Sequence, residues 1–281
     1  MPLQLPRIHR ETIIRPAGER SLLAVLREVW QFRLLIVALV KRDLRGRYSQ
    51  TILGMGWVVI TPLITVGVFV IIFGLMIKVP TNGIPTVLFY LVAVIPWYGF
   101  INTVNPTIQA IEGNVSLITK VYFPRAILGV SYGAGAMLDF LVAYLFLITT
   151  FAIGFGTWHF QLLVMMPILL ILQVATAMGV GLALAPYNAK YRDVKHFVPL
   201  ALQLFYYSTP AIYPESVVPP WARFWFDLNP LAIVITGYRS ALLGHWPPLD
   251  DIVRLFFIAL VSLGGGLYLF VKKEGEVIDY L

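Results

Sequence analysis

The stretch "KRDLRGRYSQTILGMGWVVITPL" (residues 41–63) places four basic residues within seven positions and then runs directly into an apolar segment. Of the 281 residues, 59% are hydrophobic and only 12% are charged. A soluble domain carries about a quarter charged residues, and burying its core needs no more apolar material than that average. The apolar excess must therefore face lipid, and the chain is predicted to be an all-α membrane protein.

A helix that crosses a bilayer core needs about 20 mostly apolar residues. Six segments meet or nearly meet this length, and the fifth is short and contains two prolines. They are residues 56–77, 86–104, 126–155, 162–185, 197–213 and 252–271. The sequence therefore predicts six transmembrane helices, within a membrane domain that spans residues 51–281.

The Lys and Arg residues are distributed unequally between the two predicted sides of the membrane. Ten of the 21 precede the first span, and seven more lie in the second and fourth loops and in the C-terminal tail, which gives 17 on one side and four on the other. Short cytoplasmic loops concentrate Lys and Arg. We therefore expect a multi-pass membrane protein with both termini in the cytoplasm, and this distribution does not indicate binding to nucleic acid.

Two segments fit neither a span nor a simple loop. Residues 21–40 have apolar residues near helical spacing but are interrupted by charges, which favours an amphipathic interfacial helix over a seventh, poor span. Together with the basic rim they form a predicted segment 21–50, preceded by a polar cytoplasmic tail at 1–20. Residues 214–250 are apolar and are divided by Pro219, Pro220 and Pro230. They predict short re-entrant helices in the outer loop between the fifth and sixth spans.

Motifs for catalysis are nearly absent from the sequence. There is no cysteine and no G-x-x-x-x-G-K-[ST] phosphate loop, so we expect no thiolate metal site and no nucleotide site of that kind. The stretch "GVSYG" (129–133) matches a hydrolase turn, but its position in an apolar helix favours close helix packing. Asp139 lies deep in a span, and pairing with a neighbouring helix is favoured over a proton relay. Because such motifs are nearly absent, a membrane-embedded enzyme is the less supported alternative for the function of this chain.

Aromatic residues cluster at 96–100, 205–213 and 221–226. Trp and Tyr rings commonly form a belt at the membrane interface, and this interpretation suits Trp221 and Trp225. The deeper rings can also stack on sugar faces, because they combine a flat apolar surface with a polar tip. If the cargo is a glycan, the expected path contains Trp97, Tyr98, Phe100, Tyr206, Tyr207 and Tyr213.

The opening stretch resembles a pattern found at the first span of permease subunits of polysaccharide-exporting ABC transporters, R-D-x-x-x-R-Y-x-x-T-x-L-G-x-x-W-x-x-x-x-P. The matching positions are Arg42, Asp43, Arg47, Tyr48, Thr51, Leu53, Gly54, Trp57 and Pro62. Further stretches similar to this ABC-2 type family are residues 114–128, 191–214 and 228–244. Gly129 departs from the family pattern, which often has proline there, and this leaves the subfamily open.

The resemblance implies a half-transporter rather than an enzyme. Two copies would form a homodimer, with two separate cytoplasmic ATPase subunits that bind ATP and Mg, while this chain itself would hold no cofactor and no metal. The implied cargo is an O-antigen-like glycan on undecaprenyl pyrophosphate, moved outward from the cytoplasmic leaflet of the bacterial inner membrane. Teichoic acid, capsule or another lipid-linked or hydrophobic solute is the alternative cargo.

Two groups of residues acquire expected roles from this resemblance. Arginine binds phosphate through several oriented donors, so Arg42, Arg45 and Arg47 are candidates for the lipid pyrophosphate. Simple anchoring at the membrane surface explains them equally well. The loop between the second and third spans is implied to contact the ATPase, and its candidate residues are Lys120, Tyr122, Phe123 and Arg125, with the two rings expected to be exposed.

Overall fold

The computed structural model describes residues 22–120, 123–155, 159–191 and 193–278, and these ranges contain helices and connecting segments but no strand. The elements are α1 (Leu22–Gln31), α2 (Arg33–Tyr48), η1 (Gly54–Gly56), α3 (Trp57–Phe69), η2 (Val70–Met76), α4 (Thr86–Ile108), η3 (Glu112–Asn114), α5 (Val115–Ile118), α6 (Ala126–Phe155), α7 (Phe160–Lys190), α8 (Val194–Tyr207), η4 (Glu215–Val217), α9 (Pro220–Asp227), α10 (Pro230–Leu242) and α11 (Leu249–Ile278). The prediction of an all-helical protein is confirmed for the described residues.

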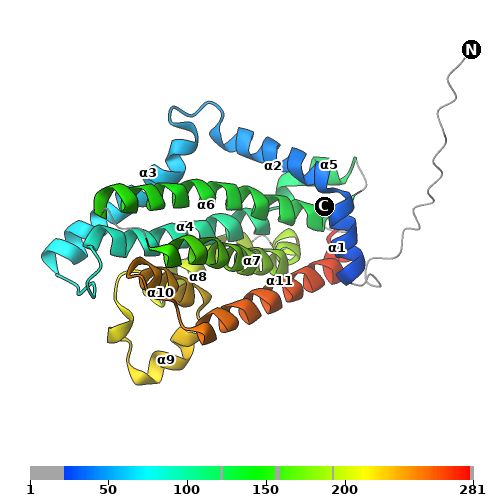
Figure 1. Ribbon diagram of the computed structural model, residues 1–281. Coiled ribbons are helices and arrows are strands. Elements are labelled where there is room, and N and C mark those ends of the chain that lie inside the picture. The colour runs from blue at the N-terminus through cyan, green and yellow to red at the C-terminus, as the bar shows by residue number, and fades with distance from the viewer. Residues whose placement is uncertain (1–21, 121–122, 156–158, 192, 279–281) are drawn as a thin grey trace, which may run out of the picture.

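Helix α4 lies at the centre of the molecule. It contacts α3, α6, α7, α8 and α10, and Figure 1 shows it running beside α6 and α7. Residues Leu88 to Ile95 of α4 are almost fully buried without a break, because apolar side chains surround this helix on every side. A helix that is hydrophobic all round is expected to be buried in this way.

Small residues bring the helices close together. A Cβ atom on Gly266 of α11 would lie 2.1 Å from the carbonyl oxygen of Gly179 in α7, so the two backbones touch at this crossing. In α6, a Cβ on Gly129 or Gly133 would collide with Leu182 or Met178 of α7. The stretch 129–133 is therefore helical and serves helix packing, as the sequence favoured over a hydrolase turn.

Among the residues that the structure describes, five helical segments are long and apolar enough to cross a membrane: Gly54–Met76, Thr86–Ile108, Ala126–Thr150, Phe160–Lys190 and Leu249–Gly275. The fifth predicted span, residues 197–213, is not among them. Its helix, α8, has 14 residues and ends at Tyr207. At 1.5 Å per residue this is about 21 Å, shorter than the bilayer core of about 30 Å. Pro210, which cannot donate a helical hydrogen bond, lies just beyond this end.

The long connection between α8 and α11 contains the two short helices α9 and α10, and prolines mark where both begin. Pro220 and Pro230 occupy the first turns of α9 and α10, where a missing backbone N–H costs nothing. Asn229 caps α10, because its side-chain oxygen accepts hydrogen bonds from the backbone N–H groups of Leu231 and Ala232. Most residues of α10 are buried against α4 and α7. The division of this loop into short helices was predicted from its prolines.

The predicted interfacial segment forms two helices, α1 and α2, with a bend at Phe32. Val25 of α1 is buried in a cluster with Leu267, Phe270 and Val271 of α11. Helix α2 continues to Tyr48, so the basic rim is helical. The location of these helices at a membrane surface stays a prediction.

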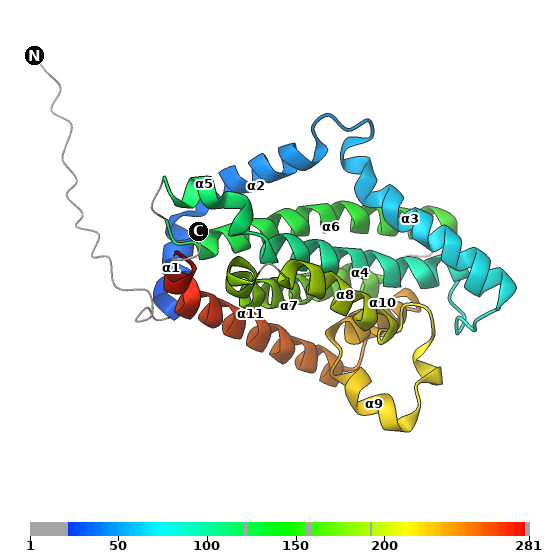
Figure 2. The same ribbon diagram turned by 180° about the vertical axis from the view of Figure 1, so that it is seen from behind.

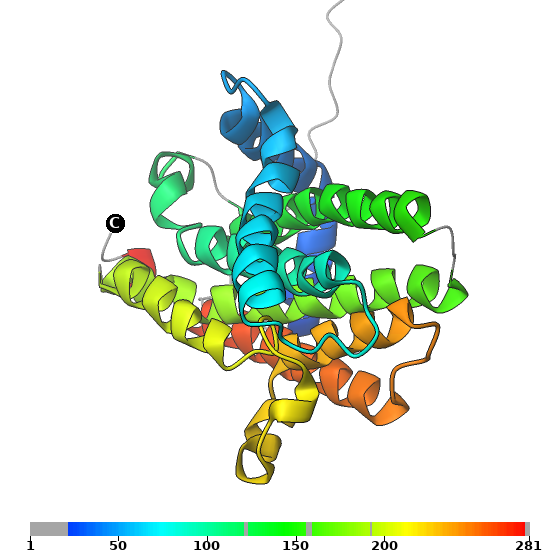
Figure 3. The ribbon, with the colours of Figure 1, turned by 90° about the vertical axis from the view of Figure 1, so that its left-hand side faces the viewer.

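The molecule has two recognisable ends. Helices α1 and α5 and the last residues of α11 gather at one, which we call the α5 end, while α9 and the loop 77–85 lie at the other, the α9 end (Figures 1 and 2). Helix α3 lies beside α4 near the α9 end and moves away from it toward α2 (Figures 1 and 2). Figure 3 views the molecule from the α9 side, with α3 and α8 on different sides of α4.

Candidate functional site

Two of the six aromatic residues expected to meet a sugar chain, Trp97 and Phe100, pack inside the protein. The ring of Trp97 lies 4.6 Å from that of Tyr206, and Phe100 lies 6.3 Å from Phe205. Trp97 and Phe100 are only 9% and 4% exposed. In this structure they seat α8 against α4 and do not face a path, because α8 covers the side of α4 that carries them.

Three of the other four rings belong to α8 and the segment that follows it, and they differ from one another. Tyr206 is partly buried between Phe69, Trp97 and Tyr207, and its hydroxyl group has no hydrogen-bond partner among the described residues. Tyr213 donates a hydrogen bond of 3.3 Å to the carbonyl oxygen of Tyr207. Tyr207 is the most exposed of the three and can meet a ligand.

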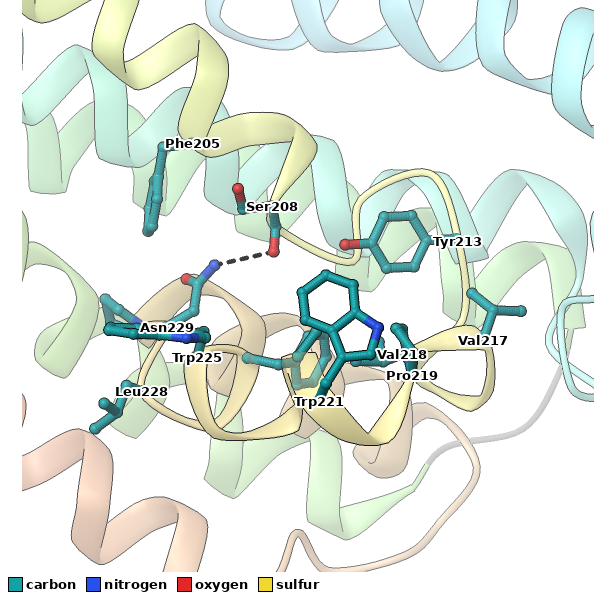
Figure 4. A pocket seen from close by; sticks show the side chains of 13 residues that line it. Phe205, Ser208, Tyr213, Val217, Val218, Pro219, Trp221, Trp225, Leu228 and Asn229 are labelled. Atoms are coloured by element: carbon teal, nitrogen blue, oxygen red, sulfur yellow. Dashed lines mark hydrogen bonds between the residues drawn. The ribbon is translucent and has the colours of Figure 1, made fainter.

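An apolar cavity lies between the end of α8 and α9, with a volume of about 730 Å³. Figure 4 shows Trp221 and Trp225 along α9 on one side of it, with Phe205 and Ser208 of the α8 segment opposite. Both tryptophan side chains are strongly exposed. We predicted an interfacial role for them, and exposure is compatible with it, but the sequence did not show that they share a cavity wall with α8.

Polar groups hold this cavity in shape. The side-chain N–H of Asn229 donates to Thr209 Oγ1 at 3.1 Å and to the carbonyl oxygen of Ser208 at 3.4 Å (Figure 4). Because the oxygen of the same side chain caps α10, Asn229 joins the end of α8 to the start of α10. The sequence analysis missed Asn229, although an Asn before Pro at a helix start is a recognisable capping signal.

The three arginines proposed for a pyrophosphate have different surroundings. Arg47 bonds Asp139 of α6 at 2.6 Å and Asp43 at 2.5 Å. Arg42 donates to the side-chain oxygen of Asn114. Both guanidinium groups therefore already hold α2 against other elements, whereas Arg45 is exposed. The preferred interpretation of Asp139, pairing with a neighbouring helix, is confirmed.

The loop expected to meet an ATPase is only partly exposed. Lys120 is exposed, and Tyr122 lies outside the described residues. Phe123 was expected to be exposed, but it is buried with Leu39 and Ile127, because α2 covers it. Arg125 donates from its guanidinium to the carbonyl oxygen of Glu274 at 2.7 Å, while the Glu274 carboxylate accepts from the Arg125 backbone N–H. Two of the four residues thus fasten the loop to α2 and α11.

Known proteins resemble this chain along most of its length. The family model described as ABC-2 type transporter matches residues 34–243. The O-antigen export system permease protein RfbA of Myxococcus xanthus is 27% identical over 92% of this chain and 99% of its own length. A protein of the same name from Klebsiella pneumoniae is 28% identical, over 88% and 95%. The polysialic acid transport protein KpsM of Escherichia coli is 22% identical, over 86% and 95%.

Proposed function

Because this chain belongs to the ABC-2 type transporter family, we propose that it is the membrane-spanning subunit of an exporter for a lipid-linked polysaccharide. The observation that carries the proposal is the full-length similarity to proteins named for O-antigen export and for polysialic acid transport. An O-antigen-like glycan on undecaprenyl pyrophosphate is the favoured cargo. Capsule or teichoic acid is the alternative, since one of these relatives is a polysialic acid transporter.

The working transporter in this proposal contains two copies of this chain and two separate ATPase subunits. The ATPases supply ATP and Mg chemistry, for which this sequence has no phosphate loop. They contact the α5 end, where Lys120 is exposed and α1 packs against α11. Since Phe123 and Arg125 are engaged within the protein, we assign them to fixing the loop and leave direct contact to Lys120 and Tyr122.

We place the α5 end in the cytoplasm of the inner membrane, together with both termini. The 17-to-4 distribution of Lys and Arg supports this orientation. Helix α8 makes the sixth crossing only together with the segment that follows it, and α9 and α10 re-enter from the outer side. Burial of α10 against α4 supports re-entry, because its apolar residues lie inside the protein.

The cargo path in this proposal uses exposed rings rather than the buried ones. Tyr207, Trp221 and Trp225 can stack on sugar faces at the α9 end, where the 730 Å³ cavity provides room. At the α5 end, Arg45 is the arginine of the basic rim with a free approach to a pyrophosphate. Arg42 and Arg47 hold the rim in place.

The proposal is tested in a strain that lacks this gene and makes its glycan. The wild-type chain should restore surface polysaccharide and should co-purify with an ATPase subunit. Trp221→Ala combined with Trp225→Ala should lower export roughly tenfold at equal membrane abundance, because each lost ring contributes about 0.5–1.5 kcal/mol.

Trp246→Ala is the matched control, since Trp246 is an exposed tryptophan that does not line the cavity. Its export should equal that of the wild type. Failure of the wild type to restore export, with no ATPase in the purified material, would instead favour a membrane-embedded enzyme.

A further inference from the structure

One face of α4 carries polar side chains at positions that a membrane-spanning helix usually fills with apolar ones. Tyr98, Asn102, Asn105 and Gln109 recur every three or four residues, which places them on one side of the helix. Asn102 and Gln109 are exposed, and Tyr98 and Asn105 are partly exposed. We call these four residues the α4 polar stripe.

The path of α3 explains why the stripe is open. Toward the α9 end, the same face of α4 carries Leu91 and Val94, which are buried in a cluster with Val66 of α3. The last close polar contact between the two helices joins Thr65 Oγ1 and the Tyr98 hydroxyl at 3.0 Å. Beyond this point α3 moves away toward α2 (Figure 2), so the stripe lacks the cover that α3 gives the other half.

The other sides of α4 are occupied along the same stretch. Trp97, Phe100 and Val104 pack in the cluster that contains Tyr206 of α8, and a Cβ atom on Gly99 would meet Phe140 of α6. The stripe therefore marks the side of α4 that the described part of the chain leaves uncovered. An open cavity of about 500 Å³ lies at its end, lined by Asn105, Pro106, Gln109, Glu112, Gly113 and Tyr132.

The stripe is unsuited to lipid. None of the side-chain amides of Asn102, Asn105 and Gln109 has a hydrogen-bond partner among the described residues. An amide in hydrocarbon loses its hydrogen bonds to water without replacement. This face must therefore meet water or a polar molecule.

The chemistry of the stripe selects a neutral, hydroxyl-rich ligand. An amide offers both a carbonyl acceptor and N–H donors, and a phenol offers a donor and an acceptor, so the stripe can bond hydroxyl groups in either sense. The cavity at its end is lined by one charged residue, Glu112, whose Oε2 lies 3.5 Å from Lys195 Nζ, so these two charges compensate each other. A pyrophosphate would need free cationic donors, which the stripe does not provide.

We propose that Tyr98, Asn102, Asn105 and Gln109 form a hydrogen-bonding track for the uncharged sugar hydroxyls of the exported glycan, in the half of the path nearest the α5 end. This inference rests on the proposed function. It adds a polar, amide-lined segment to a path otherwise described by aromatic rings. Side chains that bond weakly at each turn of α4 allow a long polymer to slide, because no single contact holds it.

The absence of cysteine from the sequence provides a clean test. Single variants Asn102→Cys, Asn105→Cys and Gln109→Cys are treated with a charged, membrane-impermeant thiol reagent in inside-out vesicles. Ile171→Cys on α7 and Leu260→Cys on α11 are matched controls, since both side chains are exposed and apolar. The stripe cysteines should react, and the controls should not. Labelling of the stripe cysteines should be lower in vesicles from a strain that makes the glycan than in vesicles from a strain that does not.

A second arm measures export at equal membrane abundance. The triple variant Asn102→Leu, Asn105→Leu and Gln109→Leu should lower export by roughly tenfold or more, because hydrogen bonds to three side chains are lost. Exchanging the amides instead, as Asn105→Gln and Gln109→Asn, should largely preserve export. This contrast separates hydrogen bonding from the mere presence of a bulky side chain.

The outcomes distinguish the track from the proposed function. If the wild type exports glycan but the stripe cysteines stay unlabelled, the face meets lipid and the track is wrong. Efficient disulfide formation between two copies at Asn102→Cys, without labelling, would show a protein interface and would also overturn it. If the labelling did not depend on the glycan and the triple Leu variant exported normally, the stripe would contact water but not the glycan, and the track would be wrong. Only failure of the wild type to export anything would count against the proposed function itself.

Discussion

Helices α3 and α4 lie side by side, and the more hydrophobic of the two is the less buried. An 18-residue stretch of the span that contains α3 has a mean hydropathy of 2.7, and 11% of its residues are buried. The corresponding stretch of α4 has a mean hydropathy of 1.7, and 67% of its residues are buried. Exposed residues recur at similar helical spacing on both. Those on the α3 span include Trp57, Thr61, Ile64, Val68 and Ile71, and those at least partly exposed on the half of α4 nearer the α5 end include Tyr98, Asn102, Asn105 and Gln109.

The difference shows that the hydropathy of a helix in this protein depends on what the helix contacts, and not on how deeply the helix is buried. A helix that faces lipid needs apolar side chains on its outer surface. A central helix needs small and polar residues, because these allow close approach and hydrogen bonds between helices. Helix α4 supplies both, in Gly99, where Phe140 of α6 packs closely, and in Tyr98, whose hydroxyl bonds Thr65 of α3.

The largest expected effect comes from adding a charge to each exposed face. Ile64→Asp places a carboxylate near the middle of the α3 span and should cost about 3 kcal/mol of insertion free energy, because a charge at a span centre is poorly solvated. Asn102→Asp should insert almost normally, since its face of α4 meets water. The measurement is membrane abundance of each variant, together with the inserted fraction of a glycosylation-tagged chain.

A control variant for depth in the membrane is Ile60→Asp. Ile60 lies as many residues from the span end at Gly54 as Asn102 lies from the span end at Ile108. This variant should insert less well than Asn102→Asp at comparable depth. Equal insertion of all three variants would remove the distinction between the two faces.

A smaller effect is expected from adding a methyl group to a glycine on each helix. A Cβ on Gly99 of α4 would lie 2.2 Å from the ring of Phe140, whereas a Cβ on Gly67 of α3 meets nothing within 4 Å. Gly99→Ala should therefore lower the free energy of unfolding by about 1–3 kcal/mol, the usual cost of overpacking. Gly67→Ala should be neutral or slightly stabilising, because alanine favours helix.

The test is unfolding of the purified protein from mild detergent by increasing denaturing detergent. A Gly99→Ala variant as stable as Gly67→Ala would mean that α4 and α6 are not in close contact.

The smallest effect concerns two hydrogen bonds of α4. Gln173 of α7 donates to the carbonyl oxygen of Pro96 at 2.7 Å in a buried position, and Thr65 of α3 bonds Tyr98 in a partly buried one. Gln173→Leu should cost about 0.5–1.5 kcal/mol, typical of hydrogen bonds between membrane helices. Thr65→Val should cost less, since water can replace its bond. The same unfolding assay compares them, and the reverse order would contradict the placement of α7 on the buried side.

Much of the fold could be predicted because it depends on local sequence. Five spans follow from the length of apolar runs, and the starts of α9 and α10 follow from Pro220 and Pro230. The fifth predicted span was wrong in length. Counting apolar residues from 197 to 213 ignored the fact that the helix ends at Tyr207, shortly before Pro210.

The site was harder to predict because side-chain direction depends on which helices become neighbours. Asp139 was expected to have a partner, but Arg47 lies 92 positions away and nothing local identifies it. Trp97 and Tyr98 are adjacent in sequence, yet Trp97 is buried against α8, whereas Tyr98 is partly exposed and its hydroxyl lies 3.0 Å from Thr65 Oγ1 of α3. Phe123 was likewise expected to be exposed because it lies beside basic residues, but α2 covers it.

The bonds between Arg125 and Glu274 join positions that are 149 residues apart. A ribosome makes the N-terminal part of a chain first, so the start of α6 waits for its partner until almost all of α11 has been made. During that interval the Arg125 backbone N–H lacks the carboxylate that later accepts its hydrogen bond. The loop before α6 therefore reaches its final geometry only after Glu274 has been made. Synthesis of the second half of α11 is thus the step that completes the α5 end, and a chain stopped before residue 274 would lack these bonds.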